Sequence, residues 1–235
     1  MTALANTTMN TTDWAIDQDP AVLARIYEDA ISIAIWQRQL QQEVECYVDE
    51  LLRKSKTIAL KLSGSPEQLM EEIQRVFPPA CFPPTLTSQQ SSCISAATFY
   101  ADIHQVLDMF SCLFEAKILG LRINTLEHAM CPRFHTDNVA IRLITTYYGL
   151  ATEWLPDQLS NRTALGTAFA SQINTPGAIT TSENHIQRMA AGDVALFKGE
   201  LWAGNEGRGI IHRSPAPTIQ QPKRLVVTCD LIEHL

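Results

Sequence analysis

The spacing of apolar residues changes near residue 118, and this change limits the folds open to the chain. Before it, apolar side chains recur every three or four residues, which is typical of amphipathic helices. After it, short β-branched and aromatic runs alternate with turn residues, which is typical of a sandwich or barrel of strands. We therefore predict an α+β fold with a double-stranded β-helix (jelly roll) in the C-terminal half, covered by an N-terminal helical layer.

Four helices are predicted in the first half of the chain. Asp19 followed by Pro20 marks the start of the first, because aspartate caps a helix and proline fits its first turn. The other three are predicted over residues 40–54, 65–76 and 92–116. The proline-rich segment 77–84 separates the last two, since proline cannot continue a helix.

Strands are predicted after residue 118 from β-branched and aromatic runs. They cover residues 119–126, 139–148, 184–189, 193–197, 209–212 and 225–231. We expect a disordered tail over residues 1–17, the helical layer over 18–117 and a jelly-roll, metal-binding region over 118–235. The helices are expected to pack on the sheet and to form one compact domain with it.

The composition argues against several classes of function. The chain has 18 basic and 25 acidic residues and a net charge of −7, so it lacks the overall basic character of proteins that bind nucleic acid or anionic membranes. No apolar run reaches the roughly 18 to 20 residues of a membrane span, and the N-terminus has no apolar signal segment. Six cysteines without a CxxC pair are expected to be reduced. These features predict a cytoplasmic protein.

The segment CPRFHTDN, residues 131–138, places a histidine two residues before an aspartate near a predicted strand. Side chains two apart on a strand share a face, so His135 and Asp137 can converge on one point. An imidazole and a carboxylate are two ligands of the 2-His-1-carboxylate triad that binds non-haem iron. His212, on a later predicted strand, is the candidate third ligand. The same residue types also suit zinc, and three unconnected polar positions are the alternative to any metal.

A facial triad leaves three positions open on iron, two for a bidentate 2-oxo acid and one for dioxygen. The far carboxylate of such an acid needs a fixed cation, and arginine binds carboxylate through two parallel hydrogen bonds. Arg224 lies at the head of the last predicted strand, and a predicted turn separates it from the strand that carries His212. We therefore expect Arg224 to anchor the 2-oxo acid.

Four further residues are candidates on the substrate side. Arg133 and Arg213 flank the proposed ligands and would bind an anionic substrate or form surface ion pairs. Arg142 lies on the strand after Asp137, where a regular strand would turn it to the opposite face and a bulge would reverse that. Trp154 is an apolar wall over the site or a core residue. The sequence leaves the substrate open between a small molecule and a protein side chain.

The sequence segments that contain these residues together resemble a bacterial family numbered 1826 among the domains of unknown function. The resemblance spans about residues 20–233. Its most specific parts are CPRFHxD at residues 131–137 and HRSP at residues 212–215. More distantly, the second half is similar to the iron(II)- and 2-oxoglutarate-dependent dioxygenases, especially the prolyl-hydroxylase-like branch.

The second resemblance implies an oxygenase that hydroxylates or otherwise oxidises its substrate with iron(II) and 2-oxoglutarate. It implies iron ligands at His135, Asp137 and His212. Arg224 would bind 2-oxoglutarate, and Tyr147 is the candidate for a second contact to it. Two alternatives stay open: a non-redox, zinc-type protein or sensor with the same ligands, and a jelly-roll binding module without activity.

Overall fold

The computed structural model describes residues 12–54, 57–77 and 96–232, which form two sheets and a layer of helices. The strands are β1 (Trp14–Asp17), β2 (Ile33–Trp36), β3 (Ala59–Gly64), β4 (Leu119–Leu126), β5 (Ile141–Tyr148), β6 (Glu153–Leu155), β7 (Gln187–Arg188), β8 (Val194–Lys198), β9 (Ile211–Arg213) and β10 (Arg224–Leu231). The helices are α1 (Gln42–Lys54), α2 (Pro66–Val76) and α3 (Ala97–Leu113). Short 3-10 helices cover Pro20–Tyr27, Asp157–Leu159, Arg162–Ala164, Ala168–Ser171 and Glu183–His185.

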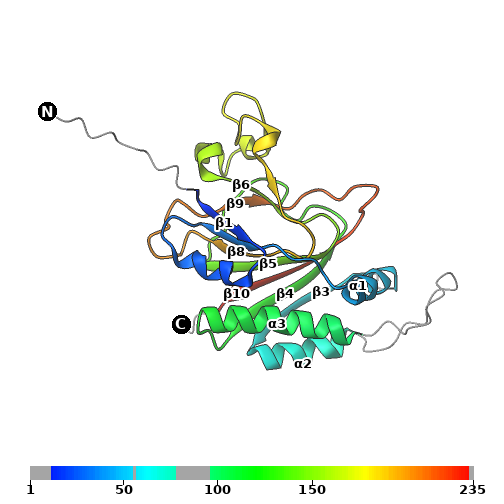
Figure 1. Cartoon of the computed structure of the whole chain (residues 1–235). Coiled ribbons are helices and arrows are strands. Elements are labelled where there is room, and N and C mark those ends of the chain that lie inside the picture. Colours follow the sequence, from blue (N-terminus) through cyan, green and yellow to red (C-terminus); the bar gives the residue numbers. More distant parts are fainter. Residues whose placement is uncertain (1–11, 55–56, 78–95, 233–235) are drawn as a thin grey trace.

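The large sheet has the strand order β1-β2-β8-β5-β10-β4-β3, and the small sheet has the order β7-β6-β9. All neighbours are antiparallel except β1 and β2. In Figure 1, α2 and α3 lie on one side of the large sheet and the small sheet on the other. The molecule is therefore mixed α+β, with the large sheet as its middle layer.

Alternation along the strands divides the apolar residues between the two faces of the large sheet. On the helical face, Leu121 and Ile123 of β4 belong to the same buried cluster as Phe99 and Phe110 of α3. On the other face, strands β2, β5, β8 and β10 share a second cluster with Trp154 of the small sheet. Two separate cores therefore hold the three layers together.

A polar contact ties helix α3 to the sheet. Arg38, which follows β2, forms an ion pair with Asp102 of α3 at 2.5 Å, and the Tyr147 hydroxyl donates a hydrogen bond to the same carboxylate at 2.6 Å. Arg38 also donates to the carbonyl oxygen of Gly192. Side chains from the sheet, the helix and a loop thus meet at one buried carboxylate.

Most predicted elements of the helical half are confirmed. Helix α2 begins with a capping box between Ser65 and Gln68 and ends at Val76, as its sequence indicated. Helix α1 starts at Gln42 and ends where predicted. The start predicted for α3 at residue 92, like most of the tail over residues 1–17, lies outside the described residues.

The segment predicted as the helical layer, residues 18–117, also contains strands. The first predicted helix is a 3-10 helix that ends at Tyr27, and β2 follows as a fully buried strand, IAIW. Strands β1 and β3 also come from the N-terminal half, so the large sheet is not confined to the C-terminal half. A four-residue buried strand has no polar alternation, so periodicity cannot distinguish it from a piece of buried helix.

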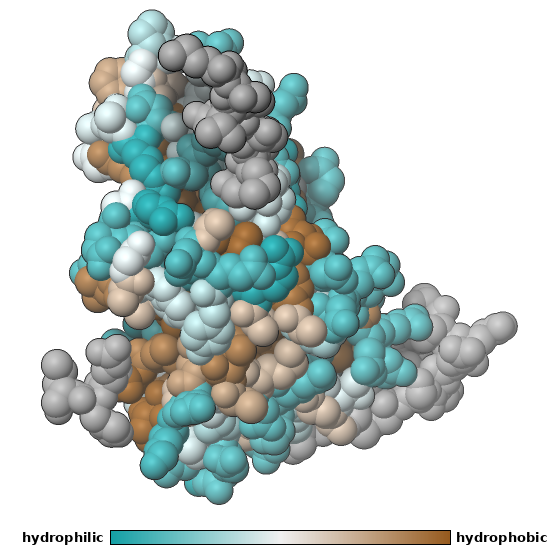
Figure 2. Space-filling view, turned by 60° about the vertical axis from the view of Figure 1, so that its left-hand side comes forward, coloured by the Kyte–Doolittle hydropathy of each residue, from teal (hydrophilic) through white to brown (hydrophobic). Residues whose placement is uncertain are grey.

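The predicted strands of the C-terminal half are confirmed with small shifts, except near residue 184. There a 3-10 helix, Glu183–His185, precedes the two-residue strand β7. Strand β6 was not predicted, because its three residues are all buried. Among the described residues, no helix is long and apolar enough to cross a membrane. Hydrophilic residues predominate on the face shown in Figure 2, with apolar residues gathered in its lower half.

Candidate metal centre

His135 and His212 lie opposite each other in a two-residue antiparallel bridge. The amide N–H of each donates to the carbonyl oxygen of the other, and both distances are 3.0 Å. The backbone therefore places the two imidazoles on the same side, with ring centroids 4.5 Å apart. Asp137 follows two residues after His135 and turns its carboxylate toward both rings.

The three side chains converge as the sequence predicted. Nε2 of His212 lies 3.3 Å from Asp137 Oδ2, and Nε2 of His135 lies 3.8 Å from Asp137 Oδ1. One ligand atom from each residue lies within 4.8 Å of the other two. Donors at about 2.1 Å from one ion and at right angles to each other lie about 3 Å apart, so small side-chain shifts would complete the site.

The Nδ1 contacts of the two imidazoles turn Nε2 of both rings toward Asp137. His135 Nδ1 lies 3.0 Å from the carbonyl oxygen of Arg133, and His212 Nδ1 lies 3.1 Å from that of Ile210. A carbonyl oxygen only accepts, so each Nδ1 donates its proton to the backbone and leaves Nε2 to face Asp137. Two imidazole nitrogens and a carboxylate that face one another are the ligand types of a 2-His-1-carboxylate metal site. The donor set therefore fits a divalent metal ion.

The surroundings keep these groups in the protonation states that bind metal. Burial would raise the pKa of Asp137, but the hydrogen bond from His212 and the charges of His212 and Arg142 outweigh it and hold the pKa well below its ordinary range. Burial, followed by the charge of His212, lowers the pKa of His135 and favours the neutral ring. A neutral imidazole and an ionised carboxylate are the forms that coordinate a metal.

Arg142 holds the carboxylate of Asp137 in place. It donates to Asp137 Oδ2 at 2.7 Å, and its other nitrogens bind both oxygens of Asp230 at 2.6 and 2.8 Å. The sequence analysis placed Arg142 on the opposite face from Asp137 only for a regular strand, and the chain between them is not a regular strand. Strand β5 begins only at Ile141, and the turn before it breaks the alternation counted from Asp137.

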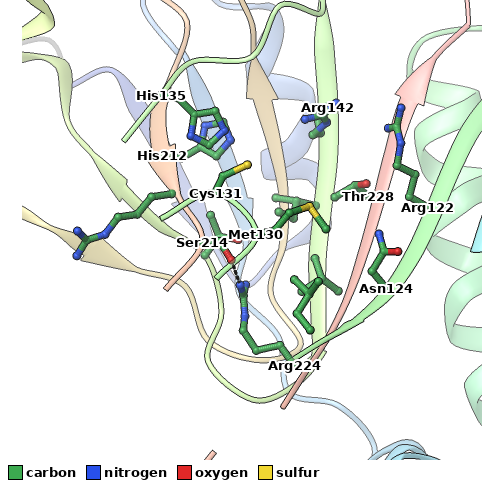
Figure 3. A pocket seen from close by; sticks show the side chains of 15 residues that line it. Arg122, Asn124, Met130, Cys131, His135, Arg142, His212, Ser214, Arg224 and Thr228 are labelled. Atoms are coloured by element: carbon green, nitrogen blue, oxygen red, sulfur yellow. Dashed lines mark hydrogen bonds between the residues drawn. The ribbon is translucent and has the colours of Figure 1, made fainter. Parts of the chain in front are cut away.

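A cavity of about 210 Å³ adjoins the two histidines and extends to Arg224. Figure 3 shows His135 and His212 on one side of it and Arg224 below them. The Arg224 side chain is 1% exposed and donates to the Leu150 carbonyl and to the Ser214 hydroxyl. Among the described residues no carboxylate forms an ion pair with it, and burial lowers its pKa to about 10. A buried guanidinium without a counter-ion is costly, which favours an anion in the cavity.

Gly149 allows the chain to pass close to Arg224. Its φ is +82°, and a Cβ atom there would lie 2.1 Å from the carbonyl oxygen of Lys223 and 3.2 Å from Arg224 Cγ. Gly166 has a similar φ of +74° but no atom within 4 Å of such a Cβ. Replacing each glycine with alanine therefore separates the cost of a positive φ from the cost of a steric contact with Lys223.

We expect Gly149→Ala to lower the free energy of unfolding by about 2–3 kcal/mol, because backbone strain and a steric clash add. Gly166→Ala is expected to cost only about 1 kcal/mol, from the positive φ alone. Urea denaturation of both variants measures the difference. Equal losses would show that the contact with Lys223 is unimportant.

The remaining predicted residues fall into different environments. Arg213 lines the cavity, binds Glu153 at 2.6 Å and stacks on the Phe134 ring. Arg133 is exposed, and its backbone carbonyl oxygen accepts from His135 Nδ1. Trp154 is a core residue, 2% exposed and packed against Trp14, so it is not a wall of the cavity.

The expectation that Tyr147 contacts a co-substrate is wrong. Tyr147 points to the helical face of the large sheet, where it binds Asp102. Residues 142 and 144 of β5 line the cavity, and an odd step along a strand leads to the opposite face. The sequence analysis also missed cavity residues on β4 and β10, namely Arg122, Asn124 and Thr228. The alternation of polar and apolar residues in LGLRINTL was the available signal for the first two.

Several solved structures are similar to this chain. The dioxygenase for auxin oxidation 1 from Arabidopsis thaliana, in complex with 2-oxoglutarate, is 10% identical with a TM-score of 0.49, and the match covers 95% of this chain and 93% of that one. The rice dioxygenase for auxin oxidation is 13% identical with a TM-score of 0.46, covering 89% and 77%. A prolyl-4-hydroxylase from Pseudomonas putida is 11% identical with a TM-score of 0.40, covering 92% and 98%. At TM-scores below 0.5 these likenesses carry no conclusion about this chain.

No curated protein matches the chain. A family model matches residues 17–230, almost the whole span of the resemblance seen in the sequence. The chain belongs to the family described as proteins of unknown function, DUF1826.

Proposed function

We propose that the protein is an iron(II)- and 2-oxoglutarate-dependent oxygenase that hydroxylates or otherwise oxidises its substrate. One observation carries the proposal: one cavity connects two histidines whose Nε2 atoms face Asp137 to a buried arginine that has no carboxylate partner among the described residues. A dicarboxylate that chelates a metal through its 2-oxo acid end would satisfy both ends of this cavity. We also propose that the two facing sheets form a jelly roll and that the described residues form one domain.

The side chains at the metal end of the cavity have different proposed roles. His135, His212 and Asp137 would hold the ion from one side and leave its other positions open toward the cavity. Bound iron(II) with 2-oxoglutarate supplies the oxidising chemistry of dioxygen. Arg142 fixes the carboxylate of Asp137, which keeps one of its oxygens turned to the ligand side.

The other end of the cavity suits a carboxylate. Arg224 and the Ser214 hydroxyl point into it together, as the dashed line in Figure 3 shows. The lining also includes the apolar side chains of Leu126, Ile144 and Val226. Apolar walls exclude water, so the ionic contacts of a bound dicarboxylate would be stronger than in solvent.

The test is an anaerobic titration of the purified protein with iron(II) and then with 2-oxoglutarate. We expect the weak visible charge-transfer band of a 2-oxo acid chelated to iron(II). Metal uptake without this band would contradict the oxygenase and support a zinc-type metal protein. Absence of metal uptake would contradict both and support a binding module.

We expect Arg224→Ala to weaken 2-oxoglutarate binding at least about tenfold in this titration, because two charge-assisted hydrogen bonds are lost. Arg224→Lys keeps the charge without the planar fork and is expected to fall between Arg224→Ala and the wild type. Arg75→Ala, which removes an exposed arginine of α2, is the control. Equal 2-oxoglutarate affinity in all four proteins would show that Arg224 does not bind the co-substrate.

A further inference from the structure

The edge of the cavity on strands β4 and β10 carries three polar side chains, those of Arg122, Asn124 and Thr228, besides the metal ligands and Arg224. We propose that Arg122, Asn124 and Thr228 bind the anionic group, a carboxylate or a phosphate, of a small organic substrate. The inference rests on the proposed oxygenase function and adds the chemical class of its substrate.

The register of the large sheet brings these three residues together. Arg122 of β4 lies directly opposite Thr228 of β10, and Asn124 is the next residue of β4 on the same face. In Figure 3 the three side chains lie on the opposite side of the cavity from His135 and His212. A ligand held by them would therefore extend across the cavity toward the metal ligands.

The charges at this edge favour an anion. Four arginines line the cavity (Arg122, Arg142, Arg213 and Arg224), and no aspartate or glutamate does so among the described residues. Asp230 accepts from both Arg122 and Arg142, and Arg142 also donates to Asp137, so Arg122 has only a share of one carboxylate among the described residues. The four arginines gather in a chain whose net charge is −7. The positive cavity therefore does not follow from the overall composition.

The polar groups beside Arg122 are available to a ligand. Asn124 and Thr228 line the cavity beside Arg122 and can offer an amide and a hydroxyl to a ligand. The Arg122 side chain is 40% exposed, whereas Arg224 is 1% exposed as a residue. Arg224 thus suits a co-substrate that is enclosed, and Arg122 suits a group that enters and leaves with each turnover.

Strand β3, the neighbour of β4, carries a further basic residue beside Arg122. Lys61 of β3 lies opposite Arg122 in the register, and its side chain is exposed. The same cavity is also lined by the apolar side chains of Leu126, Ile144 and Val226. The cavity therefore suits a molecule with an anionic end at Arg122 and an apolar part.

Calorimetric titration of the metal-free protein with inorganic phosphate tests this inference without any turnover. We expect Arg122→Gln to weaken phosphate binding at least tenfold and Arg122→Lys to restore part of it. Arg75→Gln, which removes one positive charge from exposed α2, is expected to leave the affinity unchanged. Arg224→Gln is expected to leave the Arg122-dependent binding in place.

Three results would overturn the inference: no phosphate binding, equal weakening by Arg122→Gln and Arg75→Gln, or a loss confined to Arg224→Gln. The last would assign the anion to the co-substrate end of the cavity. The iron(II) and 2-oxoglutarate band of the wild type tests the proposed function separately. A band without Arg122-dependent phosphate binding would remove the substrate class and leave the oxygenase.

Discussion

Replacing His212 with alanine is expected to weaken metal binding more than about 100-fold. Removing a group that merely orients a metal ligand costs roughly 10–100-fold in affinity, and removing the ligand itself costs more. His212 is buried, and its Nε2 faces Asp137 at 3.3 Å, so no solvent-exposed side chain can take its place without rearrangement. Competition of iron(II) or zinc with a chromophoric chelator measures the change.

His104→Ala is the matched control for His212→Ala. His104 lies on helix α3, is 44% exposed and pairs with Asp108, on the opposite side of the large sheet from the metal ligands. We expect this variant to bind metal as the wild type does. If both variants lost metal equally, the protein would bind it through scattered surface histidines. If neither variant lost metal, His135, Asp137 and His212 would not be the metal ligands.

The metal ligands were predictable because their chemistry is local. A histidine two residues before an aspartate is visible in the sequence, and few other residues can complete such a ligand set. The exact reason for the convergence was not visible. It lies in the backbone bridge between His135 and His212, which joins two segments far apart in the chain. Pairing between distant segments leaves no mark on either segment alone.

The alternation of side chains between the two faces predicts their relative orientation within one strand, but not across a turn. Arg142 and Tyr147 both belong to β5 and are separated by an odd number of positions, so they lie on opposite faces. The position of Arg142 relative to Asp137 depended on residues 138–140, which are not part of the strand. The alternation could thus have placed Arg142 relative to Tyr147, but not relative to the metal ligands.

The helices of the first half were predictable from local signals, whereas its strands were not. Helix α2 has a serine cap, a first-turn proline and a glutamine at the third position, all within four residues. Strand β2 has no such signal, and its four residues are buried because β1 and β8 flank it and both cores cover it. Its conformation is set by tertiary packing, which a short apolar run does not encode.

Asp102→Ala is expected to lower the free energy of unfolding by about 3–5 kcal/mol, because it leaves a buried guanidinium without its partner. Arg38 and Asp102 are only 10% and 11% exposed in their side chains, and Tyr147 donates to the same carboxylate. Denaturation in urea, followed by circular dichroism, measures the loss. Replacing both charges, as in Arg38→Met with Asp102→Leu, is expected to recover most of it, since no unpaired charge remains.

Asp108→Ala provides the control on the same helix. Asp108 is 49% exposed and, among the described residues, forms an ion pair only with His104, so we expect a loss below about 1 kcal/mol. Asp102 lies on the helical side of the large sheet and the metal ligands on the other, so folded Asp102→Ala should bind iron(II) as tightly as the wild type. Weaker binding would show that helix α3, through Tyr147 on β5, also sets the position of Arg142 and with it the carboxylate of Asp137.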